Sequence, residues 1–327
     1  MTTFGDESLH ARNAVTNLIA TRCARGDTLA MECIVHRVSP NAHLDLQSQV
    51  ETGGHVHLLV CAAGSTADVP ASLVGIWWPM HGSLLVSTSL ASTSGVKVAL
   101  DRGQVFVSDS QHGHLVQSLG SAAALGIVAR QEQFARLSAI QCCESATPGP
   151  TMFPAMHDAN VLVRRLLAEL ARSSAEICGT LGVAMQFRLA TVINELQRPL
   201  EALIARCPGR SLARKRAVFL RLQRVRNFLS FSTEPDLDMR TMALSVNYSV
   251  WRFIKVYMTV FGETPYANVS RCRLERAQGL LQQSLRGVAE IAQQAGYGNR
   301  ATLTRAMKRR CGVSATQLKR RNGDARA

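Results

Sequence analysis

A chain of 327 residues is longer than one hydrophobic core usually accommodates, so we expect two or three domains. Its hydrophobic content of 46% excludes a disordered protein, and the absence of an apolar run of ~20 residues excludes a membrane-spanning helix. The net charge of +14 is confined to the C-terminal third, where residues 211–327 hold 22 Lys+Arg against 7 Asp+Glu, a pattern typical of nucleic-acid binding.

The N-terminal segment and the cysteines favour a cytoplasmic protein. Met1–His10 contains Asp6 and Glu7 and lacks the apolar core of a signal peptide. The nine cysteines are odd in number and form no CxxC motif, so we expect reduced thiols that fill small apolar gaps. The adjacent Cys142 and Cys143 keep a redox-sensing regulator open as an alternative.

Residues 1–145 are predicted to form a β-rich domain that binds an effector or mediates dimerisation. Short runs rich in Val, Leu and Ile are separated by Gly, Ser, Asn and Pro clusters, which is typical of a sandwich or barrel. Residues 121–140 are expected to be helical. The predicted strands are Ala30–Val38, His55–Cys61, Leu84–Thr88, Lys97–Leu100 and Gln104–Ser108.

Trp77, Trp78 and His81 have two interpretations in such a barrel. They line a pocket for a small-molecule effector, or the aromatic residues form a plug or a dimer contact. The pairs His55/His57 and His112/His114 have the alternate spacing of metal ligands on a strand, but no carboxylate follows His57 closely. We therefore predict no metal and no cofactor, with a metal-sensing regulator as the alternative.

A linker is predicted over Ser145–Pro154, which contains three prolines in ten residues. Residues 155–210 then form a helical linker or dimerisation region. One helix is expected near residues 161–170 and a second over Leu181–Ala205, which Pro199 should end or kink. We expect this region to support a homodimer.

Residues 212–322 are predicted to form a C-terminal domain that contains an internal repeat. After a helix over Arg214–Ser230, apolar residues at helical spacing in Met239–Val246 recur 49 positions later in Val288–Ala295. Each short helix is followed by a residue that tolerates a left-handed conformation, Asn247 or Gly296. This spacing predicts two short helices that each end in a tight turn.

A second helix follows each turn, and the two again match. Ser249 and Asn299 are good N-caps, and Gly262 and Gly312 stand 50 positions apart near the ends. Ala267–Gln283 should form a connecting helix between the two units. Helix, tight turn and helix is the helix-turn-helix unit, so the sequence predicts two of them in tandem.

These residues resemble the C-terminal domain of the AraC/XylS family of bacterial transcription regulators. The resemblance covers about residues 221–320. Met307 and Ala315 depart from the family, which usually has Phe and Pro there, so we expect the fold to survive with softer local packing. The motifs that carry the resemblance are Arg273-Leu274-x-x-Ala277-x-x-Leu280-Leu281, Val288-Ala289-Glu290-Ile291-Ala292-x-x-x-Gly296-Tyr297 and Leu303-Thr304-Arg305-x-x-Lys308-x-x-x-Gly312-Val313-Ser314.

The resemblance implies two recognition helices in successive major grooves of double-stranded promoter DNA. Arg and Lys make the commonest specific contact, to guanine, whereas other basic residues hold phosphates. The residues expected to contact DNA are Ser249, Trp251, Arg252, Lys255, Arg300, Thr302, Thr304, Arg305 and Lys308, and those expected to contact phosphates are Arg309, Arg310, Lys319 and Arg320.

The expected fold is α+β multidomain: an N-terminal cupin-like β-rich domain, a helical linker or dimerisation region, and an all-α C-terminal domain with two helix-turn-helix motifs joined by a long helix. The resemblance implies a transcription activator that contacts RNA polymerase, responds to a small-molecule effector and does not act on membranes. An effector-independent architectural DNA-binding protein is the other alternative. The sequence lacks the motifs of a Ser-His-Asp hydrolase or a phosphate-binding loop, so an enzyme is not predicted.

Overall fold

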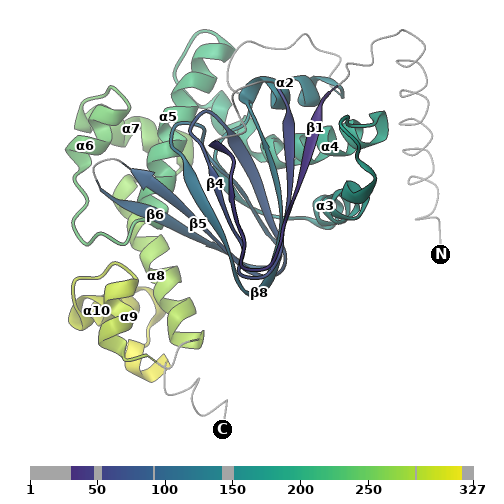
Figure 1. The fold of residues 1–327 in the computed structure, drawn as a ribbon. Coiled ribbons are helices and arrows are strands. Elements are labelled where there is room, and N and C mark those ends of the chain that lie inside the picture. The colour runs from purple at the N-terminus through teal and green to yellow at the C-terminus, as the bar shows by residue number, and fades with distance from the viewer. Residues whose placement is uncertain (1–30, 48–53, 91–92, 142–150, 284–285, 319–327) are drawn as a thin grey trace, which may run out of the picture.

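The structure, a computed structural model, describes residues 31–47, 54–90, 93–141, 151–283 and 286–318. The N-terminal part is β-rich and the C-terminal part mostly helical, as expected (Figure 1). The strands are β1 (Cys33–Val38), β2 (His43–Asp45), β3 (Val56–Cys61), β4 (Thr66–Val69), β5 (Val74–Leu90), β6 (Thr93–Leu100), β7 (Gln104–Val107), β8 (His114–Ala129) and β9 (Ala155–Asp158). The helices are α2 (Gln131–Ala139), α3 (Val161–Ser173), α4 (Val183–Ala205), α5 (Leu212–Phe231), α6 (Met239–Ser245), α7 (Val250–Phe261), α8 (Pro265–Gln283), α9 (Val288–Gln294) and α10 (Arg300–Cys311).

Two long strands, β5 and β8, organise a single mixed sheet. They pair antiparallel along most of their length, and the register shifts between Pro79 and Ser83, where Gly82 has a positive φ of 69°. In one half of the sheet the strand order is β1-β3-β8-β5-β7-β9. In the other half, β4 pairs with the N-terminal end of β8 and β6 pairs with the C-terminal end of β5. The sheet therefore bends around an interior.

The expectation of a helix over residues 121–140 is wrong for its first half. Residues up to Ala129 belong to β8, and only Gln131–Ala139 are helical. The Gly- and Ala-rich stretch lies between β3 and β5, with both of its faces covered, so small side chains there allow close packing from each side. Local composition did not reveal this, because burial on both faces removes the alternating pattern.

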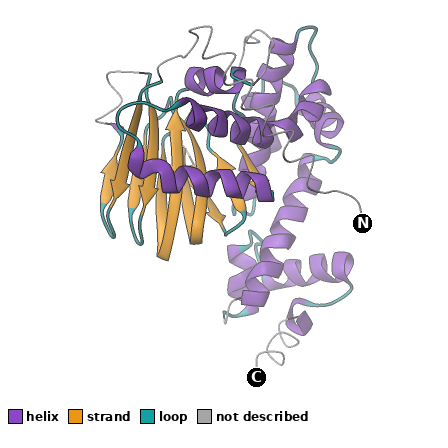
Figure 2. Cartoon of the chain, turned by 90° about the vertical axis from the view of Figure 1, so that its right-hand side faces the viewer, coloured by secondary structure: helices purple, strands orange, loops and turns teal. Residues whose placement is uncertain are grey.

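Alternate residues of the central strands pack into two separate cores. Leu59, Trp77 and Val128 point into the interior of the bent sheet. Leu58, Trp78 and Ile127 point outward, where α2, α3 and α4 cover the sheet (Figure 2). Helices α3 and α4 thus pack on the sheet through Val163, Leu167 and Leu189, among others.

Trp77 fills the interior of the sheet. Its side chain is fully buried and its indole N–H donates to His114 Nε2 at 3.1 Å. Gly126 makes room for the ring, because a Cβ there would lie 2.3 Å from Trp77 Cζ3. Trp78 lies in the other core and His81 is exposed, so the three residues expected to line one effector pocket do not lie together.

Buried histidines make the stability of this domain sensitive to acid. Burial lowers the pKa of His57, His114 and His157 from 6.5 to about 4. The neutral imidazole is favoured in the folded state, so stability is lost as the pH falls from 6.5 toward about 4. We expect the free energy of unfolding, measured by urea titration, to decline between about pH 7 and about pH 5. A rise over that interval would contradict this.

Pro199 does not end its helix. Helix α4 continues through it to Ala205, although proline cannot donate the backbone hydrogen bond of that turn. Leu196, Leu200 and Ile204 are buried on either side of the proline, and this packing holds both halves in one helix. Among the described helices, none is long and apolar enough to cross a membrane.

Helix α5 joins the C-terminal part to the bent sheet. One side of α5 packs in the core of the first helical unit, and Phe228 and Phe231 on another side pack against the sheet interior. Arg224 donates to both carboxylate oxygens of Asp109, at 2.6 and 2.8 Å. These contacts make α5 one of the elements through which the two parts of the chain touch.

Candidate nucleic-acid interface

Two short-helix, turn and long-helix units occupy the C-terminal part, α6 with α7 and α9 with α10. Helix α8 lies between them, as Figure 1 shows at its lower left. Each unit has its own hydrophobic core. Asn247 and Gly296, after the short helices, have φ values of 59° and 85°, and Gly262 and Gly312 end the long ones with φ values of 75° and 73°. These left-handed turns are confirmed.

Helix α7 presents an exposed face of mixed aromatic and basic character. The Ser249 hydroxyl begins the helix by accepting from the Arg252 amide at 3.4 Å. The Trp251 side chain is 72% exposed, and the Lys255 ammonium lies 5.0 Å from its ring centroid. All four residues that were expected to contact DNA from this helix are exposed. Phe253 and Tyr257 anchor the opposite side in the core.

Helix α10 presents five basic residues and no acidic one. Asn299 caps it by accepting from the Thr302 amide at 2.9 Å. The hydroxyls of Thr302 and Thr304 are half-buried and donate to Asn299 Oδ1 and to the Arg300 carbonyl, so both are already engaged within the helix. The exposed residues of this helix that were expected to contact DNA or phosphate are Arg300, Arg305, Lys308, Arg309 and Arg310.

The two departures from the family pattern are accommodated in one core. Met307 and Ala315 are both fully buried, together with Leu303, Ile291 and Tyr297. Methionine is flexible enough to fill the space that an aromatic ring would otherwise take.

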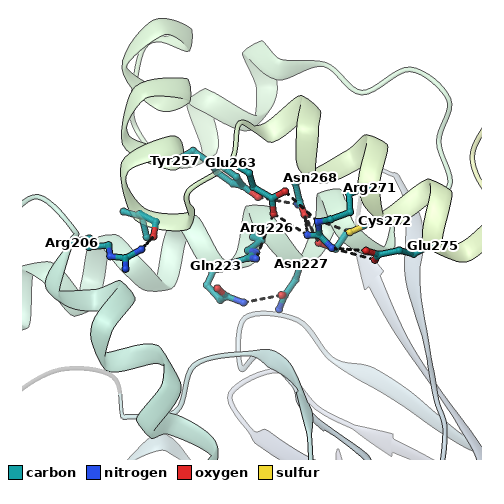
Figure 3. Close-up of polar contacts among 12 residues, drawn as sticks. Arg206, Gln223, Arg226, Asn227, Tyr257, Glu263, Asn268, Arg271, Cys272 and Glu275 are labelled. Carbon is teal, nitrogen blue, oxygen red and sulfur yellow. Dashed lines mark hydrogen bonds and ion pairs between the residues drawn. The ribbon is translucent and has the colours of Figure 1, made fainter. Parts of the chain in front are cut away.

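A polar network fixes α7 against α5 and α8 (Figure 3). Asn268, fully buried, donates to the Tyr257 hydroxyl at 2.9 Å and accepts from Arg271 at 2.8 Å. Arg271 also donates to Glu263 at 2.9 Å, and Arg226 of α5 lies 3.6 Å from the same carboxylate. Burial raises the pKa of Tyr257, so its hydroxyl stays protonated. These contacts therefore fix the position of α7 relative to α5 and α8.

A second set of hydrogen bonds holds the two units in a fixed relation. Arg276 of α8 donates to the backbone carbonyls of Ser230 at 2.7 Å, Ser232 at 3.3 Å and Ala295 at 3.4 Å. Arg273 reaches the carbonyls of Glu234 and Pro235. Arg276 therefore links the end of α5, which shares a core with the first unit, to the end of α9 in the second unit.

Sequence reasoning missed these positioning residues. Arg273 belongs to the motif that carried the family resemblance, yet its role was not inferred. Arg276 directly precedes the buried Ala277, at the border of the apolar face of α8. This place is the one feature of the sequence that points to its positioning role. The carbonyls that the two arginines contact lie 19 to 46 residues away, so no local pattern predicts them.

The other expected sites lie in the β-rich part of the chain or outside the described residues. Cys142, Cys143, Lys319 and Arg320 lie outside the described residues. Burial raises the pKa of Cys33 and Cys207 to about 12 and that of Cys61 to about 11, as expected for thiols that fill apolar space. Cys178 is exposed, so the expectation is wrong for that thiol. His57 Nδ1 lies 3.0 Å from His36 Nε2, and His55 is paired with Glu32. Within the described parts of the chain, no group of three or more His, Cys, Asp or Glu side chains is arranged to hold a metal ion.

Comparisons with known proteins agree with the geometry of the C-terminal part. A helix-turn-helix domain family matches residues 219–321. A search of curated proteins found no match.

Solved structures show similarity over the same segment or over most of the chain. The C-terminal domain of AraT, a response regulator from Geobacillus stearothermophilus, is 25% identical, with a TM-score of 0.29 over 31% of this chain and 84% of its own. The DNA-binding domain of the transcriptional factor AdpA, solved with a target DNA, is 24% identical, with a TM-score of 0.30 over 32% and 95%. ToxT from Vibrio cholerae with bound unsaturated fatty acid is 9% identical, with a TM-score of 0.31 over 81% and 94%.

Proposed function

We propose that this chain, which in residues 219–321 belongs to the AraC-type helix-turn-helix family, is a sequence-specific transcription activator with an N-terminal regulatory domain. In this proposal α6/α7 and α9/α10 are two helix-turn-helix motifs, and α7 and α10 enter successive major grooves of promoter DNA. The bent sheet is a cupin-like domain that responds to a small-molecule effector. The protein acts in the cytoplasm and contacts RNA polymerase beside the promoter.

The observation that carries the proposal is the pair of exposed basic helix faces held at a fixed separation. Trp251 and Lys255 on α7, and Arg300 and Arg305 on α10, are exposed, whereas the opposite sides of both helices are anchored in cores. Guanidinium groups donate in a forked geometry that matches guanine O6 and N7. Two such faces, rigidly connected, suit the reading of one extended DNA site.

Selection of binding sites from random DNA tests this function. We expect a defined sequence that recurs near promoters, whereas an architectural protein would select little sequence. Arg305→Ala should cost ~1–3 kcal/mol on the selected site and relax the preference at one base position. Arg309→Ala, the matched loss of a phosphate contact, should weaken selected and random DNA alike. Equal losses on both kinds of DNA for Arg305→Ala would show that Arg305 does not read bases.

A homodimer completes the proposal and places two copies on repeated half-sites. The first turn of helix α3 offers a surface for it, since Val161 and Leu162 are apolar and yet 73% and 46% exposed. Light scattering at micromolar concentration should give the mass of a dimer, and Val161→Asp should shift it toward that of a monomer. A monomeric wild-type protein in that measurement would contradict the dimer.

A further inference from the structure

A basic cavity lies beside the start of α7 and shares Arg252 with the exposed face of that helix. It has a volume of about 650 Å³ and is lined by the segment before α5, the first half of α5 and the turn between α6 and α7. Its lining includes four arginines and no Asp or Glu. These are Arg210, Arg214, Arg221 and Arg252.

No carboxylate neutralises the four guanidinium groups. In the described parts of the chain, none of the four forms an ion pair with a carboxylate. The Arg252 guanidinium lies 4.9 Å from the ring centroid of Tyr248, which also lines the cavity. A Cβ on Gly209 would lie 3.0 Å from Arg214 Cγ, so the glycine lets the chain pack against the stem of that arginine. Four like charges around one hollow whose lining has no carboxylate favour the binding of an anion there.

We propose that this cavity binds backbone phosphates of the same DNA whose bases α7 contacts. This inference rests on the proposed function and extends the protein–DNA contact from α7 to the N-terminal half of α5. Arg252 belongs both to the exposed side of α7 and to the cavity, so a duplex lying against α7 passes the mouth of the cavity. Arginine forks match the geometry of phosphate oxygens, and a phosphodiester chain supplies several charges at once. The α5 arginines therefore position the duplex and read no base.

Arg214→Gln combined with Arg221→Gln tests the proposal on full-length protein and the selected DNA site. Each phosphate contact contributes about 0.9 to the slope of log affinity against log salt, so the slope should become less steep by about 1–2. At about 0.1 M salt the affinity should fall by roughly tenfold or more, equally for selected and random DNA. Arg214→Lys with Arg221→Lys keeps the charge and should retain the slope. Arg37→Gln with Arg102→Gln, at exposed positions of the bent sheet, removes the same charge outside the cavity and should change nothing.

A scan of neutral methylphosphonates along the selected DNA identifies the phosphates themselves. One or two adjacent positions should weaken the wild type but leave the α5 double glutamine variant unaffected. Equal losses for both proteins at every position, or an unchanged salt slope, would overturn the proposal while leaving the DNA-binding function intact. Failure of the wild type to select any DNA would instead overturn the function.

Free phosphate compounds form the last arm of the experiment. Calorimetric titration of the DNA-free protein with inorganic phosphate and with ATP should show no saturable binding at micromolar concentrations. Saturable binding that the double glutamine variant loses would reassign the cavity to a small phosphorylated ligand and overturn the DNA assignment.

Discussion

Arg276→Leu is expected to destabilise the C-terminal domain by about 2–4 kcal/mol and to loosen the spacing between the two recognition helices. The guanidinium donates to the carbonyls of Ser230, Ser232 and Ala295, and leucine leaves all three without this partner. Two of these carbonyls lie at the end of α5, which shares a core with α7, and the third follows α9, so the same hydrogen bonds fix the position of α7 relative to α10. Urea unfolding measures the first effect.

The second effect is visible on DNA. Inserting one base pair between the two DNA segments that α7 and α10 contact rotates and displaces one segment relative to the other. The wild type should therefore lose most of its affinity for this DNA. The Arg276→Leu variant should bind the original site more weakly and lose less on insertion. Arg198→Leu, which removes an exposed arginine paired with Glu195 on α4, should change stability by no more than about 1 kcal/mol. Identical sensitivity to the insertion in variant and wild type would refute the role of Arg276.

Trp77→Ala is expected to cost about 3–5 kcal/mol of stability, the largest effect of a single substitution in the bent sheet. The indole is fully buried, contributes to the central core and donates to His114. Alanine would leave a large void, and the backbone at Gly75 and Gly126 is held by long strands that cannot close over it. Thermal or urea unfolding, followed by far-ultraviolet circular dichroism, measures the loss of stability.

The matched control is Trp251→Ala, the same chemical change at an exposed site. Its effect on stability should stay within about 0.5 kcal/mol, whereas its affinity for the selected DNA should fall. A Trp77→Ala protein within about 1 kcal/mol of the wild type would mean that the neighbouring side chains close over the space, and it would contradict the rigid packing of this interior.

The sequence by itself determined the elements whose causes are local. The N-caps Ser249 and Asn299, the left-handed turns at Asn247 and Gly296, and the apolar spacing of α6 and α9 all depend on residues within one or two turns of each other. A helix end or a tight turn is satisfied by its immediate neighbours, so its residue types can be read directly. The exposed basic faces of α7 and α10 follow from the same periodicity.

Tertiary structure alone decided what depends on distant partners. Residues 121–129 became strand because β3 and β5 enclose them, and Trp77 and Trp78 separated because successive residues of a strand face opposite sides. Arg224 meets Asp109 across 115 residues and Arg276 meets Ser230 across 46. Charge and hydrogen bonding in a folded chain act through space, so the basic cavity beside α7 and the link between the two helical units exist only once the helices have packed.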